Sequence, residues 1–431
     1  MDYIPILVLV ISFMCFLAIG MPVAWSISIS SLLTMMVSIS TMSALTTVSQ
    51  RMATGLDSFA LLAIPFFVLS GQLMNKGGIA HRLIAFAKTL VGALPGGLAL
   101  INVISAMLMG AIAGSAMASA SAMGSIIGPE MEKEGYSREF GAAVNITSAT
   151  VGLVIPPSNV LIVYSLASGG VSIAALFLAG YIPGILTGLF LMIVAYFWAK
   201  KKGYKVGERS SFKQIIKTFW HAFPSLMLLV VIMGGIVMGI FTATEASAIA
   251  VLYTLVLGFV YKEISWKNLP EVLLDSSATT AIVMLLIAAS MSMSWVMSFE
   301  NIPQSISDVL LTVSDNPIII LLIINLLLLF VGIFMDMTPA VLIFTPIFLP
   351  VVTELGMDPI QFGIIMVLNL CIGLCTPPVG SVLFVGVGIA NTTIEKVIKP
   401  LLPMFVAMLI ALFLITYFPE LTLWLPRIFG V

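Results

Sequence analysis

Long apolar stretches separated by short polar segments dominate this sequence. Ten of them are about as long as the ~20 residues that an α-helix needs to cross a bilayer. We expect spanning helices over Ile4–Ile19, Val23–Val48, Phe59–Met74, Val144–Ala167 and Ile173–Ala199, and in a second series over Pro224–Phe241, Ala246–Tyr261, Ala281–Met297, Ile364–Ile389 and Leu401–Phe418. The pattern predicts an all-α polytopic membrane protein.

Two further apolar segments, Ile104–Gly128 and Ile318–Leu349, are interrupted near their middles. Small residues around Gly114–Ser115 interrupt the first, and Asp336–Pro339 interrupts the second. Irregular backbone at membrane depth is tolerated only where protein or a water-filled cavity surrounds it. We therefore expect each segment to be a re-entrant helical hairpin, which enters the bilayer and returns to the same side.

Two expected spans contain a pair of prolines, Pro156–Pro157 and Pro377–Pro378. Proline lacks the N–H that would bond the carbonyl four residues back, so the pairs release the carbonyls of Gly152–Leu153 and Gly373–Leu374. An unpaired carbonyl in hydrocarbon costs several kcal/mol, so a broken helix needs protein, water or an ion at the break. Simple proline kinks are the alternative, and the duplication of the pattern disfavours them.

The two series match at a constant offset of 221 residues. The matched pairs are Pro129 and Pro350, Gly135 and Gly356, Gly152 and Gly373, and the two proline pairs. We infer an internal duplication, with a first repeat over residues 1–199, a basic linker over residues 200–217 and a second repeat over residues 218–431. Each repeat would hold five spanning helices, one re-entrant hairpin and one broken helix.

Charge predicts the orientation of the repeats. Five crossings is an odd number, so the second repeat should be inverted relative to the first. If the basic linker is cytoplasmic, every Lys and Arg except Arg51 and Arg427 falls on the cytoplasmic side. This agrees with the positive-inside rule. Both termini are then periplasmic, and the two hairpins enter the bilayer from opposite sides.

Composition agrees with this class of protein and excludes others. Hydrophobic residues make up 60% of the chain and charged residues 9%, against roughly 25% charged in soluble domains. Cys15, Cys371 and Cys375 all lie in apolar segments, which indicates packing rather than disulfides or a metal cluster. The sequence has no phosphate-binding glycine loop, zinc-protease motif or serine-hydrolase elbow, so we expect a gradient-driven protein and not an enzyme.

Inverted repeats with broken helices are typical of secondary transporters, which bind substrate and coupling ions near the midplane. The released carbonyls are hard oxygen ligands suited to Na⁺. Each hairpin tip could complete one cation site per repeat, through Ser115 and Ser119 or through Asp336 and Thr338. Ser115 lies at the turn of its hairpin, where a hydroxyl and a helix N-terminus can meet an anion. Glu245 could be functional or could cap a helix beside Thr242.

The chain resembles the large membrane subunit of a tripartite ATP-independent periplasmic (TRAP) transporter over nearly its whole length. The motifs that carry the resemblance are Gly20–Ala24, Ala63–Gly71, Gly110–Ser115, Ile155–Ser158, Thr242–Ala246, Asp336–Pro339 and Thr376–Gly380. Each motif is weak by itself, and their order and spacing are specific.

The resemblance implies an elevator-type fold in which a transport domain with both hairpins moves against a scaffold. It implies import of a carboxylate, such as a C4-dicarboxylate or sialic acid, with two or more Na⁺ ions across the bacterial inner membrane. The implied partners are a separate small four-helix membrane subunit and a periplasmic substrate-binding protein. The implied Na⁺ ligands are the carbonyls of Gly152, Ile155, Pro156, Gly332, Gly373, Thr376 and Val379. The implied substrate contacts are Ser115, Ser158 and Asp336. We add Thr338 because it lies at the expected tip of the second hairpin.

Two alternatives remain open at this point. A stand-alone Na⁺/carboxylate symporter of related fold would need no binding protein. A channel or membrane assembly scaffold would show no saturable, Na⁺-dependent uptake.

Overall fold

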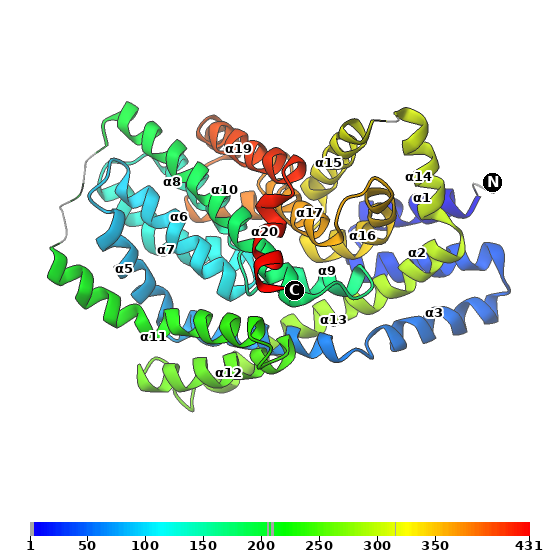
Figure 1. Ribbon diagram of the computed structural model, residues 1–431, viewed down its shortest axis with the longest axis horizontal. Helices are drawn as coiled ribbons and strands as arrows, with labels where there is room; N and C mark the ends of the chain where they lie inside the picture. The colour runs from blue at the N-terminus through cyan, green and yellow to red at the C-terminus, as the bar shows by residue number, and fades with distance from the viewer. Residues whose placement is uncertain (1–3, 205–206, 208–210, 315) are drawn as a thin grey trace.

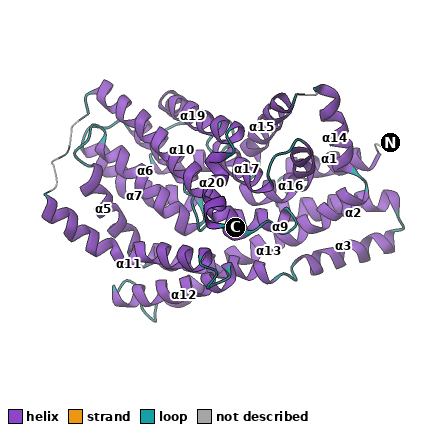
Figure 2. Ribbon diagram, in the orientation of Figure 1, coloured by secondary structure: helices purple, strands orange, loops and turns teal. Residues whose placement is uncertain are grey.

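The computed structural model describes residues 4–204, 207, 211–314 and 316–431 (Figure 1). The described residues form twenty α-helices and one short 3₁₀ helix, and no strand occurs among them (Figure 2). Eight of the helices in these ranges are long and apolar enough to cross a membrane, and four shorter apolar helices accompany them. The all-α polytopic fold expected from the sequence is confirmed.

The helices divide at the basic linker. Before it lie α1 (Ile4–Ala18), α2 (Val23–Ser38), α3 (Thr41–Gly55), η1 (Phe59–Leu62), α4 (Ala63–Lys76), α5 (Ile79–Val91), α6 (Gly97–Ala113), α7 (Ala116–Lys133), α8 (Arg138–Val151), α9 (Asn159–Ala167) and α10 (Ile173–Lys202). After it lie α11 (Phe212–Val237), α12 (Ala243–Val260), α13 (Leu269–Phe299), α14 (Ile302–Val313), α15 (Pro317–Phe334), α16 (Met337–Glu354), α17 (Pro359–Gly373), α18 (Ser381–Ile389), α19 (Ile394–Tyr417) and α20 (Glu420–Phe429).

The helix boundaries recur at the offset of 221 residues. Helix α7 begins at Ala116 and α16 at Met337, and α10 begins at Ile173 and α19 at Ile394. The tight turns before the broken helices match as well, because the equivalent glycines 135 and 356 have φ values of 88° and 84°. The two halves of the chain therefore share one order of elements, from the hairpin through the broken helix to a long closing helix. Inversion of the halves across the membrane stays a prediction.

Contacts between helices separate an outer and an inner group (Figure 1). In the outer group, α12 packs on α4, α11 on α5, and α13 on α2, α3 and α4. The inner group contains both hairpins, α6–α7 and α15–α16, with both broken helices, α8–α9 and α17–α18. Its halves interlock, because α19 packs on α8 and α10 on α17. The two groups also touch, because α4 and α5 pack on α6 and α13 packs on α16, so the outer group reaches both hairpins.

Buried sulfur atoms lie where the two broken helices meet. The Cys371 thiol donates to the carbonyl oxygen of Thr150 at 3.0 Å, and Cys375 Sγ lies 3.4 Å from Thr150 Oγ1. Both cysteines are buried and free, and Cys15 is free and exposed. Thr150 and Cys371 are 221 residues apart, so equivalent positions of the two halves touch each other.

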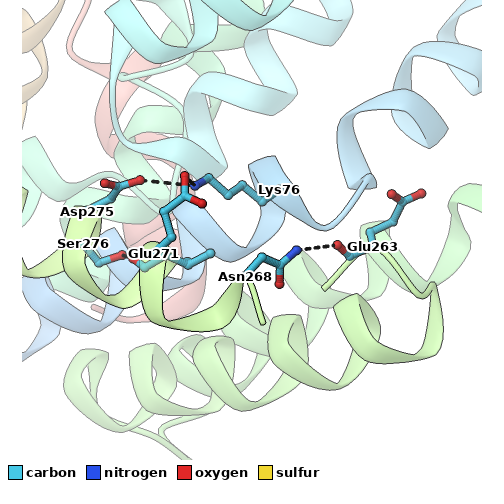
Figure 3. A network of polar contacts seen from close by, with 7 residues as sticks. Lys76, Glu263, Asn268, Glu271, Asp275 and Ser276 are labelled. Atoms are coloured by element: carbon cyan, nitrogen blue, oxygen red, sulfur yellow. Dashed lines mark hydrogen bonds and ion pairs between the residues drawn. The ribbon is translucent and has the colours of Figure 1, made fainter. Parts of the chain in front are cut away.

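A charged cluster joins the two halves within the outer group (Figure 3). Lys76, the last residue of α4, places its ammonium nitrogen 2.8 Å from a carboxylate oxygen of Glu271 and 3.3 Å from one of Asp275. Asn268 precedes α13 and donates its side-chain amide to the carbonyl of Glu263 at 3.2 Å. The carboxylates are more than half exposed, so each pair contributes only ~0–1 kcal/mol. The cluster thus links the end of α4 to the start of α13 and adds little stability.

One expected span is wrong. The stretch Val23–Val48 is two helices, because Ile39 is extended and ends α2. Helix α3 follows with a polar sequence in which only Ala44 and Val48 are buried. Polar side chains on most of its surface make α3 a poor spanning helix, and it packs on α13 instead.

Further differences concern bounds and short helices. The second hairpin turns at Met335–Asp336, so Met337–Pro339 already belong to α16 and are not part of the turn. The amphipathic helices α5 and α14 and the C-terminal α20 lack the long apolar run that marked the other elements, and sequence analysis missed them. Lys205 and Arg209 of the linker, Asp315 of the outer loops and residues 1–3 of the N-terminus lie outside the described residues.

Candidate functional site

The tip of the first hairpin is made by Gly114 and Ser115. Gly114 has a φ of 60°, a left-handed conformation that glycine adopts without strain, and it ends α6. Ser115 then begins α7, and its hydroxyl oxygen accepts a hydrogen bond from the N–H of Ala118 at 3.3 Å. This N-cap satisfies one of the free N–H groups of the first turn. The expected turn at Gly114–Ser115 is confirmed.

The second hairpin tip replaces the serine with a carboxylate. Asp336 occupies the N-cap position of α16, but its side chain makes no capping hydrogen bond. The residue is exposed, although protein atoms surround its carboxyl group closely. A negative charge next to a helix N-terminus is also favoured by the helix dipole.

Paired glycines hold each hairpin against its broken helix. A Cβ atom on Gly152 would lie 2.5 Å from the Cα of Gly110, and one on Gly373 would lie 2.5 Å from the Cα of Gly332. Real Cβ contacts are never this short, so each crossing needs a residue without a side chain. Both breaks are thereby pressed directly against the backbone of a hairpin.

The backbone at the breaks is irregular over 152–158 and over 374–380. The peptide bonds Pro156–Pro157 and Pro377–Pro378 are cis. Three of the four carbonyls that the prolines release accept a bond within the protein. The donors are the Ser158 hydroxyl to Leu153 at 2.5 Å, the Thr376 N–H to Gly373 at 2.9 Å and the Leu383 N–H to Leu374 at 3.3 Å. The sequence predicted that protein, water or an ion would satisfy these carbonyls, and the protein does so for three of them, because the loops fold back onto the helix ends.

Other carbonyls at the breaks remain without a hydrogen-bond donor. Within the described part of the chain none reaches the carbonyl oxygens of Gly152, Ile155, Pro156, Gly332, Thr376 or Val379. A Cβ atom added to Gly380 would lie 2.7 Å from the carbonyl oxygen of Leu374 and 2.9 Å from that of Thr376. Two oxygens therefore converge on one point beside the second break.

A cavity of about 270 Å³ lies where both tips and both breaks meet. Its lining includes Ser115, Asp336 and Thr338 from the hairpin tips and Leu153 and Leu374 from the breaks. A smaller cavity of about 160 Å³ shares Ser115 and Thr338 and extends toward α4. Asp336 is the one ionisable residue among the described residues that line either cavity.

Four helix N-termini converge on the larger cavity. First-turn residues of α7, α9, α16 and α18 line it, namely Met117, Val160, Met337 and Val382. Each N-terminus carries about half a positive charge and unpaired N–H groups, so the cavity can hold an anion without any Lys or Arg. Asp336 precedes one of these helices, α16, and it adds the one carboxylate of the described lining. The lining thus combines hydrogen-bond donors suited to an anion with one carboxylate.

Residues 10–421 match the family described as the tripartite ATP-independent periplasmic transporter, DctM component. The chain belongs to this family. Among its relatives, the uncharacterized protein YgiK of Salmonella typhimurium is 56% identical over 100% of this chain and 99% of that protein. The sialic acid TRAP transporter large permease protein SiaM of Vibrio cholerae is 39% identical over 95% of this chain and 96% of that protein.

A solved structure shows the same fold at much lower sequence identity. The YdaH transporter of Alcanivorax borkumensis is 13% identical, covers 88% of this chain and 89% of its own, and superimposes with a TM-score of 0.66. This likeness shows the fold. The family match and the spanning helices together make this TRAP large permease chain a multi-pass membrane transport subunit.

The substrate contacts expected from the sequence separate into two groups in this TRAP subunit. Ser115, Asp336 and Thr338 line the cavity together, although they come from both halves of the chain. Ser158 is 1% exposed, does not line the cavity, and uses its hydroxyl to bond the carbonyl of Leu153. Ser119 is likewise buried and donates to the carbonyl of Ala106 at 3.2 Å. Both hydroxyls thus stabilise the backbone near the site.

Several lining residues of this TRAP subunit were missed by sequence analysis. Thr279 of α13 lines both cavities, and the amides of Gln72, Asn75 and Asn159 line the smaller one. The run Ser276–Thr280 is polar within a long apolar helix, which could have marked α13 as lining a polar space. Gln72 and Asn75 gave no such signal, because they lie at the end of α4 next to a loop.

Glu245 has a structural role. Its backbone N–H donates to the Thr242 hydroxyl at 3.2 Å, and its carboxylate accepts from the Thr242 N–H at 2.8 Å. This reciprocal pair is a capping box at the start of α12. The capping interpretation of Glu245 is confirmed.

Proposed function

We propose that this chain is the large permease subunit of a Na⁺-coupled secondary transporter that imports a small organic anion. The observation that carries the proposal is the cavity between two hairpin tips that is lined by the first turns of four helices and by Asp336. An anion bound at the N-termini is repelled by Asp336 unless a cation neutralises the carboxylate. Binding of the anion therefore favours binding of a cation, and that is the coupling a symporter requires.

We place one Na⁺ site at each break. The first would use the carbonyls of Gly152, Ile155 and Pro156, and the second those of Gly332, Gly373, Thr376 and Val379. Six of these seven carbonyls accept no hydrogen bond within the described residues, which supports the assignment. The exception is Gly373, and a carbonyl oxygen has a second lone pair that an ion can use.

The substrate would lie in the cavity next to Asp336 and would bind Ser115, Thr338 and the helix N-termini. Ser158 would stabilise the first break through its hydrogen bond to the carbonyl of Leu153. A carboxylate such as sialic acid or a C4-dicarboxylate fits these donors. The name of the Vibrio cholerae relative supports sialic acid as one candidate. A small four-helix membrane subunit and a periplasmic binding protein complete the transporter.

The proposed location is the bacterial inner membrane with both termini in the periplasm. The inner helix group would be the moving transport domain of an elevator, and the outer group its scaffold. The close packing of each hairpin on its broken helix, α6 on α8 and α15 on α17, supports their movement as one domain.

Reconstitution tests the function. The full chain is placed in proteoliposomes with and without its small subunit and binding protein, and uptake of radiolabelled sialic acid or succinate is measured under an inward Na⁺ gradient. We expect saturable uptake only with all three components and only with Na⁺. Uptake by this chain alone would establish the stand-alone symporter instead, and non-saturable flux would establish a channel.

A further inference from the structure

Three side-chain amides line the smaller cavity, of about 160 Å³, beside the candidate site. Gln72 and Asn75 belong to α4 in the outer group, and Asn159 is the first residue of α9 in the inner group. The cavity shares Ser115 and Thr338 with the larger cavity, so the two adjoin at the hairpin tips. No amide side chain occurs among the described residues that line the larger cavity, so the amides distinguish the smaller one.

These amides are accessible to a small molecule. Each of the three residues is half-buried, and no hydrogen bond joins their side chains to another residue in the described part of the chain. Their polar atoms are not among the fully buried atoms that lack a partner, so some of their surface stays open. A Cβ atom on Gly114 would collide with the amide nitrogen of Asn159, so this amide lies directly on the first hairpin tip.

The chemistry of the amides favours hydroxyl groups as partners. An amide has N–H donors and a carbonyl acceptor, and a hydroxyl group likewise both donates and accepts. An ionised carboxylate only accepts, so it would leave the amide oxygens without a donor. None of the described residues that line the smaller cavity is ionisable. This cavity therefore suits a neutral, hydroxylated group.

Electrostatics also distinguish the two cavities. The first turns of four helices line the larger cavity, whereas Asn75 lies in the last turn of α4, where the helix dipole is negative. The ammonium of Lys76 is already paired with the carboxylates of Glu271 and Asp275, so one positive charge meets two negative ones (Figure 3). The α4 end of the smaller cavity therefore disfavours a second carboxylate on the substrate.

We propose that the substrate is a hydroxylated monocarboxylate, which occupies both cavities at once. Its carboxylate lies at the helix N-termini of the larger cavity, and its hydroxyls bond the amides of Gln72, Asn75 and Asn159. This inference rests on the function proposed above and narrows it, because it makes these three residues determinants of specificity. A dicarboxylate is then a poorer ligand than a hydroxylated acid with one carboxylate.

Protection from chemical labelling tests the inference on the full chain in lipid nanodiscs with Na⁺ present. Thr279 is exposed, lines both cavities and donates its hydroxyl to the carbonyl of Asp275 at 2.9 Å. Thr279→Cys in a Cys15→Ser background therefore gives a reporter thiol at the cavities. Its rate of reaction with a small methanethiosulfonate reagent is measured against increasing gluconate, hexanoate, succinate and sorbitol. We expect gluconate to protect saturably, at concentrations at least tenfold lower than the other three require.

Two variants test the amides themselves. Gln72→Met and Asn75→Leu keep the approximate size of each side chain and remove its hydrogen-bonding groups. Each is expected to lower the preference for gluconate over hexanoate about tenfold, the loss of roughly one hydrogen bond. Gln304→Met, at an exposed position of α14, is the matched control and should keep the preference. Labelling at exposed Lys202→Cys corrects for the general effect of polyols on hydration.

The outcomes separate this inference from the function on which it rests. Equal protection by gluconate and hexanoate, stronger protection by succinate, or a preference for gluconate that survives both variants would overturn the role of the amides. The anion site in the larger cavity would stand in each of these cases. Protection by sorbitol equal to that by gluconate, or by none of the four compounds, would overturn both.

Discussion

At the residue scale, the candidate site consists mainly of backbone N–H and carbonyl groups and of one carboxylate. Asp336 is the one ionisable side chain among the described residues that line the candidate cavity, and the hydroxyls of Ser115 and Thr338 accompany it. The cavity's capacity for an anion comes from helix N-termini, which no side-chain motif reports. Substitutions can therefore separate the proposed cation-binding role of Asp336 from the proposed anion-binding role of the helix N-termini.

Asp336→Asn is expected to raise the Na⁺ concentration for half-maximal uptake by roughly tenfold. This change corresponds to a loss of ~1.4 kcal/mol in the free energy of cation binding. Asparagine keeps the shape and removes the charge that a cation needs. The measurement is initial uptake against Na⁺ concentration in proteoliposomes with all subunits present. Asp308→Asn, on an exposed position of α14, is the control. An unchanged Na⁺ dependence in Asp336→Asn would contradict the proposed role.

Gly373→Ala is expected to abolish uptake, because the added Cβ would lie 2.5 Å from the Cα of Gly332 and would push the hairpin from the break. Gly388→Ala is the matched control, since nothing lies within 4 Å of a Cβ at that helical position. The control should gain up to ~1 kcal/mol from helix propensity. Thermal unfolding and uptake are measured on both. Equal behaviour of the two variants would refute the close crossing.

At the element scale, each broken helix is an interrupted span whose two halves are capped within the protein. In the second break the Thr376 N–H and the Leu383 N–H bond the carbonyls that the prolines released, so the loop is ordered by its own backbone. The carbonyls of Thr376 and Val379 lie on the loop side and accept nothing from the described residues. The proposed ion ligands are therefore loop carbonyls more than helix-end carbonyls.

Replacing Pro377 and Pro378 with alanine is expected to restore helical N–H groups and to draw the loop carbonyls into helix hydrogen bonds. The variant should fold, but the number of Na⁺ ions moved per substrate should fall. The measurement is the reversal potential, or the ratio of ²²Na⁺ to substrate uptake. Pro403→Ala within α19 is the control for losing a proline from a helix. Wild-type stoichiometry in the double variant would rule out the carbonyl sites.

At the scale of the whole molecule, the two halves meet at equivalent positions and enclose the cavity jointly. Its lining takes Ser115 and Leu153 from the first half and Asp336 and Leu374 from the second. Neither half could form the cavity alone. The orientation of this assembly in the membrane is the remaining prediction at this scale.

Single cysteines at Arg51 and Lys202 should react with a membrane-impermeant maleimide from opposite sides. Arg51→Cys on α3 should label in intact cells whose outer membrane is permeable, and Lys202→Cys at the end of α10 only after the inner membrane is opened. Cys15→Ser is the background, because Cys15 is the one exposed cysteine. Labelling of both from the same side would refute the predicted topology and with it the inversion.

The sequence by itself determined the membrane class, the hairpins, the breaks and the repeat, because each leaves a local signature. Apolar runs report burial in lipid, proline pairs report missing N–H groups, and a constant offset reports duplication. The first hairpin tip at Gly114–Ser115 and the capping role of Glu245 were predictable for the same reason, since a turn or a cap depends on residues within one helical turn.

Only the tertiary structure decided which of these features meet. Ser115 and Asp336 are far apart in the chain, and their shared cavity depends on how the two halves interlock. The same is true of Ser158, whose hydroxyl bonds the backbone instead of facing the cavity, and of Thr279, which α13 brings to the cavity from the outer group. A side chain's partner across the molecule is set by packing between helices, and hydropathy and spacing along one helix do not record it.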